Sequence, residues 1–271
     1  MDNTREPHVS GGFYPDDYEA LMDSIKGSMD ITMPDIRYKK LIGAIVPHGQ
    51  YMYSSHTAAY AYKIIQESKK RTFLIIGPNH SKFPAYPAIY LDGYWSTPLG
   101  YAKVNSELSE RLLLKSDIIH DDKEAHITEH SIEVQLPFLQ YLFKSNFTFT
   151  PLILGNQGAA IARNIAETIE SLEEKPFVLI SSNFNHYLPY DKNNELDQIL
   201  INDIQEMRTL KFYQDIEKYG ITACGYGAIA ILMLITKNMK GKIALLNHSN
   251  SGDYSKDRKR VVGYSAMIAY K

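Results

Sequence analysis

The sequence predicts an α/β fold, a sandwich in which helices cover both faces of a sheet. Short β-rich runs alternate along the chain with segments of helical period, the pattern of strands connected by helices. Several of these runs are continuously apolar, as expected for strands that are buried on both faces. No repeat, low-complexity tract or long linker interrupts the 271 residues, so we expect a single domain over 1–271.

The elements of this fold are expected in an alternating order. Strands are expected at Leu41–Val46, Thr72–Ile76, Ala88–Leu91, Thr148–Leu154, Phe177–Ser181, Ile243–Asn247 and Val261–Ala269. Helices are expected at Asp16–Ser28, His56–Ser68, Ser106–Lys115, Glu129–Phe143, Ala159–Glu173, Glu195–Leu210 and Gly225–Lys237. The first helix follows Pro15-Asp16, a pair that commonly begins a helix.

The composition excludes several classes of protein. Hydrophobic residues make up 44% and charged residues 22%, as in ordinary globular proteins. A net charge of −2 argues against a general nucleic-acid binder, because no basic excess exists to displace counterions from phosphates. The single cysteine cannot form an internal disulfide, and no apolar run approaches the roughly 20 residues that span a bilayer. With no secretory signal evident, we expect a cytoplasmic protein without membrane partners.

Three of the expected strands end in the same way, with a histidine shortly after the apolar run. These histidines are His48, His80 and His186. A lone histidine is usually structural, but in open α/β sheets ligands bind outside the carboxyl ends of the strands, so these three loops are expected to converge. Imidazole nitrogen binds iron, copper and zinc, and it also acts as an acid or base near neutral pH. The three histidines therefore predict a metal-binding pocket.

The only cysteine, Cys224, precedes the last expected helix and is expected to join this pocket. A free cysteine is most often a small buried hydrophobe. At a helix N-terminus, however, the dipole favours the thiolate, which is a nucleophile and a metal ligand. His248 and Asp253 follow another strand and are further candidates for the same rim, although a turn is the more ordinary structure for a stretch rich in Gly, Asn and Ser.

A competing metal site is suggested by His126-Ile127-Thr128-Glu129-His130, which matches the H-x-x-E-H pattern of a class of zinc proteases. On a helix, His126 and His130 would share a face, and Glu129 would act as the base of a zinc-dependent hydrolase. Alternatively, His130 and Glu133 face the strand-end pocket and support its ligands. Matches to so short a pattern arise readily by chance, so both interpretations stay open.

Further motifs extend this set over essentially the whole chain, in order. They are Arg5–Pro15, Pro47–Ser54, Gly77–His80, Thr97–Gly100, Glu129–Leu139, Ser181–Tyr187, Cys224-Gly225, Ser251–Asp253 and Val262–Tyr264. Together they resemble the Memo (mediator of cell motility) family, a relative of the class III extradiol ring-cleavage dioxygenases.

The resemblance implies a three-layer αβα sandwich like that of the class III extradiol dioxygenases, with a pocket formed by His48, His80, His186 and Cys224. It implies that His48, His80 and Cys224 bind an iron or copper ion, with zinc as a further possibility, and that His186 is the catalytic acid/base group. Tyr51, Asn183, His130, Glu133 and Asp253 are then expected around the pocket. No nucleotide or organic cofactor is evident, and the resemblance implies a functional link to a radical-SAM protein.

The sequence departs from the family pattern beside this pocket. Asn183 stands where the family usually has an aspartate, Gly49-Gln50 stands where it has alanine and glycine, and His248 stands at a tyrosine-like position. The first change removes a carboxylate that would bind metal or orient His186. A thiolate at Cys224 in place of a carboxylate ligand also makes ring-cleaving dioxygenase activity a weak expectation, because thiolate is softer and is itself open to oxidation.

Three functions are therefore compared. The first is a redox-capable metal protein of the Memo type, a possible metal-dependent oxidoreductase. The second is a module that binds a peptide or small molecule without turnover. The third is the zinc hydrolase built on His126, Glu129 and His130.

Overall fold

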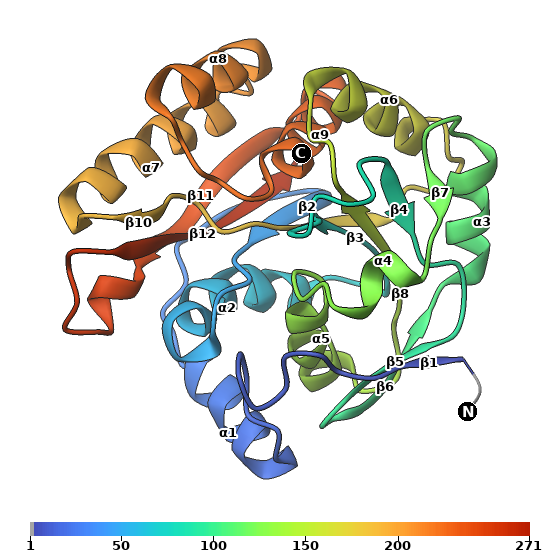
Figure 1. The fold of residues 1–271 in the computed structure, drawn as a ribbon, viewed down its shortest axis with the longest axis horizontal. Coiled ribbons are helices and arrows are strands. Elements are labelled where there is room, and N and C mark those ends of the chain that lie inside the picture. The colour runs from blue at the N-terminus through green and yellow to red at the C-terminus, as the bar shows by residue number, and fades with distance from the viewer. Residues whose placement is uncertain (1–2) are drawn as a thin grey trace.

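The computed structural model describes residues 3–271 and has an α/β fold built on a twelve-stranded mixed sheet (Figure 1). Its centre consists of neighbouring parallel strands, in the order β8 (Thr148–Leu154), β3 (Thr72–Pro78), β9 (Phe177–Ser181) and β2 (Leu41–Val46). The carboxyl ends of β3, β9 and β2 therefore lie next to one another at one edge of the sheet. This is the edge where the sequence places the three histidines.

Further strands, in both parallel and antiparallel pairs, extend the sheet on both sides of this parallel centre. Beyond β2 lies the long strand β12 (Val261–Tyr270), which also pairs with β11 (Lys242–Asn250) and β10 (His186–Leu188). On the other side, β8 pairs with β6 and β4, and β5, β1 and β7 complete the sheet. Their bounds are β1 Thr4–Arg5, β4 Pro87–Ile89, β5 Tyr94–Thr97, β6 Gly100–Val104 and β7 His120–Asp121.

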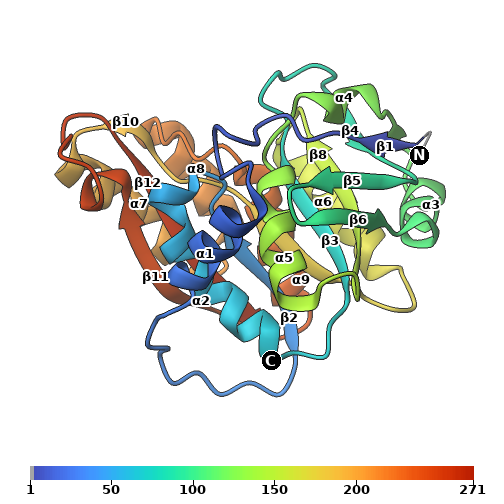
Figure 2. The ribbon, with the colours of Figure 1, turned by 90° about the horizontal axis from the view of Figure 1, so that it is seen from below.

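Helices cover both faces of the sheet, as Figure 2 shows from below. One face carries α1 (Tyr18–Ser28), α2 (Tyr51–Glu67) and α5 (Leu136–Phe143). The other carries α3 (Ser106–Leu114), α6 (Ala159–Glu170), α7 (Tyr190–Gln205), α8 (Thr209–Tyr219) and α9 (Tyr226–Asn238). Within residues 3–271, no helix is both long and apolar enough to span a bilayer.

The continuous apolar strands serve two cores at once. In β3, Phe73 and Ile75 point into the core under α2 and α5, whereas Leu74 and Ile76 point into the core under α6 and α9. Successive side chains of a strand point to opposite faces, so a strand with helices on both sides needs apolar residues at every position. The α/β class predicted from these runs is confirmed.

Three of the expected helices are wrong in extent, and the one expected at His56–Ser68 begins earlier, at Tyr51. The helix expected at Glu129–Phe143 is a 3₁₀ turn at Glu133–Gln135 followed by α5, and a separate short helix, α4, ends at Ile127. The guanidinium of Arg5 contributes to the break, because it donates to the carbonyl oxygen of Glu129, which the first turn of the expected helix would use itself. It also binds the carbonyl oxygens of His126 and Ile127, just before that helix. The helix expected at Glu195–Leu210 is α7, which begins earlier, and α8, which the sequence did not indicate.

Gly43 is a site where the packing of the sheet excludes a larger residue. A Cβ atom there would lie 2.3 Å from the backbone oxygen of Val178 and 2.7 Å from Leu232 Cδ1. Gly43→Ala is expected to lower the free energy of unfolding by about 1–3 kcal/mol, because β2 would have to move away from both β9 and α9. Gly27→Ala in α1 is the matched control, since nothing lies within 4 Å of its Cβ position, and it should stabilise by about 0.5–1 kcal/mol. Denaturant titrations measure both values, and equal effects would contradict the packing argument.

Candidate metal centre

The site is assembled at the carboxyl ends of β2, β3 and β9, and the register of the sheet brings these ends together. Val46 pairs with Ser181, and Ile76 pairs with Ile180. The chain leaves β2 through Pro47 to His48, and it leaves β3 to reach His80. Because the strands are parallel and adjacent, the loops that follow them meet over the same edge.

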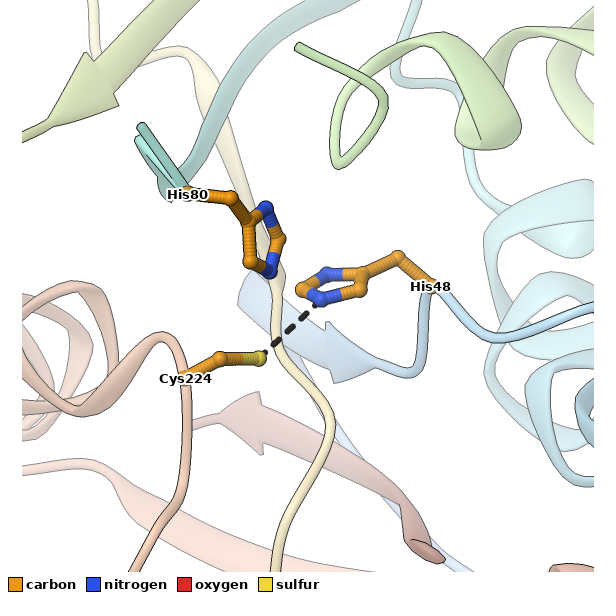
Figure 3. A group of neighbouring side chains, drawn as sticks. All are labelled: His48, His80 and Cys224. Carbon is orange, nitrogen blue, oxygen red and sulfur yellow. Dashed lines mark hydrogen bonds between the residues drawn. The ribbon is translucent and has the colours of Figure 1, made fainter. Parts of the chain in front are cut away.

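His48, His80 and Cys224 converge on one point, although they come from three separate parts of the chain (Figure 3). The Nε2 atom of His48 lies 3.0 Å from Cys224 Sγ. One ligand atom of each of the three residues lies within 4.8 Å of the others. The rings of His48 and His80 meet edge to face, with centroids 5.2 Å apart. Two imidazoles and a thiolate in this arrangement form a donor set suited to a soft or borderline transition metal.

The tautomer of His48 follows from its contact with the Ser181 hydroxyl. Ser181 Oγ donates its one hydrogen to the carbonyl oxygen of Ser131, 2.5 Å away, and accepts from Gln135 Nε2 at 2.7 Å. Its remaining interaction, with His48 Nδ1 at 3.0 Å, must therefore be one in which Nδ1–H donates. The atom of the ring that faces Cys224 is therefore Nε2.

His80 is held in the same tautomer by the carboxylate of Glu129. His80 Nδ1 lies 2.9 and 3.1 Å from the two carboxylate oxygens, and its backbone N–H donates to Oε2 at 2.7 Å. Burial of Glu129 opposes ionisation, but the hydrogen bonds and charge of His80 outweigh it and lower the Glu129 pKa. An ionised carboxylate only accepts, so Nδ1 carries a proton and Nε2 is directed to the centre. Carboxylate–histidine pairs of this kind orient metal-binding histidines in proteins.

The same contacts raise the basicity of His80. Burial lowers its pKa, but hydrogen bonds to Cys224 and Glu129 and their negative charges raise it to about 10. Without a metal ion, His80 therefore carries a proton on Nε2 that must leave when a metal binds there. Metal binding at this site should release protons.

Cys224 lies in the loop before α9, and its sulfur is surrounded by donors. The backbone N–H of Asn183 donates to Sγ at 3.3 Å, and the Gln157 side chain holds the Cys224 carbonyl at 2.6 Å. Burial alone would raise the thiol pKa, but the electrostatic interaction with His48 and hydrogen bonds from His186, His48 and His80 lower it well below its ordinary value. Cys224 is therefore a thiolate, the form that binds metal.

His130 and His186 stand beside this group in different roles. The His130 ring stacks on that of His80 with centroids 4.5 Å apart, and burial lowers its pKa to about 3, so it is neutral. His186 donates its backbone N–H to Thr222 Oγ1 at 2.8 Å and its Nδ1–H to the Thr222 carbonyl oxygen at 2.9 Å. Burial lowers the pKa of His186, but the hydrogen bond and charge of Cys224 raise it above the ordinary value.

These residues open into a pocket of about 1110 Å³. Its wall includes His80, His130, Asn183, His186 and Cys224, and His48 lies beneath it with only 1% exposed. The pocket is also lined by Phe13, Gly49, Gln50, Tyr53, Lys82, Asn156, Gln157, Tyr187, Tyr226 and Tyr264. This space is at the upper end of the sizes that hold small molecules, and it adjoins the group formed by His48, His80 and Cys224.

Three residues expected around the pocket lie elsewhere. Tyr51 is buried and donates to the carbonyl oxygen of Val134 at 2.6 Å. Glu133 is buried behind the site, where it pairs with Arg5 at 2.8 Å. Asp253 closes a 3₁₀ turn by accepting from the backbone N–H of Asn250. Each is used in local structure, and none lines the pocket.

The zinc-protease interpretation of His126, Glu129 and His130 is not supported by the geometry. Helix α4 ends at Ile127, so His126 and His130 do not share a helix face. His126 is fully buried and donates from Nε2 to the Ala88 carbonyl oxygen at 3.1 Å. Among residues 3–271, the second group of potential ligands consists of His80, Glu129 and His130, without His126. The H-x-x-E-H pattern is present in the sequence, but its residues do not bind one ion together, because His126 bonds to Ala88 and Glu129 bonds to His80.

Several residues that organise the site were missed from the sequence. The partnership of Glu129 with His80, and the roles of Ser181, Gln135 and Thr222, depend on contacts between segments far apart in the chain. Ser181 carried a signal because it ends the strand that leads to His186, and Glu129 and Gln135 lie in the motif Glu129–Leu139, but nothing local indicated their partners. Thr222 has no local pattern that would identify it.

The fold and the pocket together define the class of protein. It is an α/β protein in which two histidines and a cysteine that could hold a metal ion lie at the carboxyl ends of the central strands. The family model of the Memo-like proteins matches residues 5–268. MEMO1 family proteins of Thermoplasma volcanium and Thermoplasma acidophilum are each 46% identical over 266 residues, which cover 98% of both chains. A MEMO1 family protein of Sulfolobus acidocaldarius is 39% identical over 278 residues, covering 97% of this chain and 98% of the relative. The chain belongs to the Memo-like protein family, as the motifs predicted.

The buried His126 should make the fold sensitive to acid. Burial lowers its pKa to about 3, whereas in the unfolded chain it titrates near 6.5. Protons therefore bind the unfolded state more readily, and the stability that His126 contributes is full above about pH 6.5 and falls as the pH decreases. Between pH 7 and pH 4 the loss should be about 3 kcal/mol.

The His126→Gln variant tests this, because glutamine retains a donor for Ala88 but does not titrate. Urea unfolding at a series of pH values should show a shallower loss of stability in the variant than in the wild type. His120→Gln, at an exposed position, is the control and should follow the wild type. Parallel pH profiles for wild type and His126→Gln would contradict the assignment.

Proposed function

We propose that this protein is a redox-capable metal protein in which His48, His80 and Cys224 bind an iron or copper ion. The observation that carries the proposal is the 3.0 Å approach of His48 Nε2 to Cys224 Sγ, with the other nitrogen of each histidine already held by Ser181 or Glu129. Both rings therefore direct their Nε2 atoms to the thiolate. Preset tautomers and a lowered thiol pKa are what a metal site requires of its ligands.

The chemistry of the donors favours iron or copper while allowing zinc. Imidazole suits all three metals, and thiolate favours copper(I), zinc and iron. When bound, such an ion supplies redox or Lewis-acid chemistry at the floor of the pocket. The site differs from that of class III extradiol dioxygenases, whose iron is bound by two histidines and a carboxylate, so we do not propose ring cleavage. Helix–sheet–helix layering and histidines at strand ends support a shared fold with those enzymes.

His186 is proposed as the group that moves a proton in the pocket. Its Nδ1–H is committed to the Thr222 carbonyl, so its Nε2, which also hydrogen-bonds to Cys224, is the atom that would gain or lose a proton. It lines the pocket and lies outside the group formed by His48, His80 and Cys224. An acid/base group next to a metal ion, but not bound to it, serves a substrate in the pocket.

Metal analysis of protein purified without an affinity tag tests the proposal. The wild type should contain iron or copper in near-stoichiometric amount by mass spectrometry, and a Cys224→Ser/His80→Ala variant should lose most of it, because two of the three ligands are removed. His120→Ala is the matched control, since His120 is exposed and belongs to no group of potential ligands.

Two outcomes would contradict the proposal. Equal metal content in the double variant and the control would show that the metal binds elsewhere. The wild-type protein could also take up no metal, even when ferrous or cuprous ion is added under anaerobic conditions. That result would favour a module that binds a ligand without metal chemistry. Circular dichroism of each variant distinguishes loss of metal from loss of fold.

Glu129→Gln tests the support given to His80. Glutamine keeps the size and an acceptor oxygen but lacks the charge that fixes the Nδ1–H tautomer. We expect metal affinity to fall by about 10–100-fold, the usual effect of losing such a carboxylate. Competition with a chelator of known affinity measures the change, and Glu107→Gln on the exposed surface of α3 serves as the control. An affinity unchanged within twofold would remove Glu129 from the site.

A further inference from the structure

The amide of Asn183 is oriented by its neighbours and presents an unused donor. Its Oδ1 accepts the backbone N–H of His48 at 2.9 Å, and because a backbone N–H only donates, the amide cannot be flipped. Its Nδ2 hydrogens have no acceptor among residues 3–271. Asn183 is only 7% exposed, and it lines the pocket next to Cys224. A donor that opens into a pocket from a nearly buried side chain is free to bind a ligand or water.

The charged side chains of the pocket wall are positive. Among the described residues that line the pocket, none is aspartate or glutamate, whereas Lys82 is one of them. Arg260 adds a second positive charge at the rim, with its guanidinium 5.1 Å from the ring centroid of Tyr187, a lining residue. A pocket with cations at its mouth and no carboxylate attracts negatively charged ligands.

The nearby negative groups are paired with neighbouring donors. Glu129 is 5% exposed and is occupied by His80 and by the backbone N–H of Ser131. The Cys224 thiolate faces His48. Both charges are therefore compensated by the histidines or by a metal ion, and they do not oppose an anion beside Asn183.

We propose that the pocket contains a subsite for the carboxylate of a small organic acid, in which Asn183 Nδ2 donates to a carboxylate oxygen and Lys82 supplies the opposite charge. This subsite would hold a substrate of the proposed metal protein, and it depends on that proposed function only in lying next to the metal ion. A single lining lysine and a neutral amide match a monoanion, whereas a dianionic phosphate monoester is usually met by arginines or several cations. The rings of Tyr53, Tyr187, Tyr226 and Tyr264 provide apolar surface for the body of the ligand.

The test compares benzoate with its neutral isostere benzamide by isothermal titration calorimetry. Benzoate should bind the wild type at least tenfold more tightly than benzamide. Asn183→Asp should weaken benzoate binding by about tenfold or more, because the carboxylate keeps the acceptor for His48 N–H but replaces the donor by a like charge. Benzamide binding should change little. Lys82→Gln should weaken benzoate binding and reduce its sensitivity to salt.

Matched controls place the same changes away from the pocket. Asn202→Asp on α7 keeps the acceptor for Gln198 and adds the same charge at an exposed position, and Lys69→Gln removes an exposed lysine before β3. Both should bind benzoate like the wild type. Phenyl phosphate is titrated in parallel, and binding that exceeds that of benzoate would overturn the choice of a carboxylate.

The subsite and the metal group can fail separately. Benzoate titrations are repeated after metal removal with a chelator, and the metal content of every variant is measured. Benzoate binding that disappears with the metal but is unaffected by Asn183→Asp would overturn the subsite, because the anion would then be a ligand of the ion. Binding that survives metal removal and falls in Asn183→Asp supports the subsite even if the metal proposal fails. Equal affinity for benzoate and benzamide would also overturn it.

Discussion

The hydroxyl group of Ser181 is the contact on which the rest of the site depends. It accepts from Gln135 and His48 and donates to Ser131, so one oxygen joins the end of β9, the loop after β2 and the segment before α5. It is fully buried, and no water competes for its bonds. A buried hydroxyl with its donor and both acceptor positions in use fixes the direction of each partner. The Nε2 atom of His48 faces Cys224 for this reason.

A second constraint reaches the site from the N-terminal segment. Arg5 stacks on Trp95 with its guanidinium 4.2 Å from the ring centroid, and it binds Glu133 and three carbonyl oxygens of residues 126–129. These bonds hold the irregular segment that carries Glu129, the residue that orients His80. Irregular backbone is stable in a protein interior when such donors satisfy its carbonyl groups. The group formed by His48, His80 and Cys224 is thus supported on one side by the sheet and on the other by a buried arginine.

The predictions from the sequence succeeded where the signal was local. Continuous apolar runs correctly indicated the central strands, because a residue inside a helix–sheet–helix sandwich is buried whichever way it points. Histidines at strand ends were correctly expected to converge, because parallel strands deliver their loops to one edge. The prediction of a helix at Glu129–Phe143 failed, since Arg5 binds a carbonyl oxygen that the helix would need. The prediction of a metal ligand at His126 failed because its side chain bonds to Ala88, on β4. Neither competitor is visible in the segment itself.

The sequence by itself determined the α/β class, the family and the three residues that meet in Figure 3. Residue type and position relative to a strand or helix end are properties of a short segment, and they suffice for those conclusions. Only the tertiary structure decided which nitrogen of His48 and His80 is free, that Glu129 belongs to His80 and not to a protease motif, and that Asn183 has a donor to spare. Protonation and hydrogen-bond direction depend on partners about 50 or more residues away in the chain, and these become neighbours only when the sheet has formed.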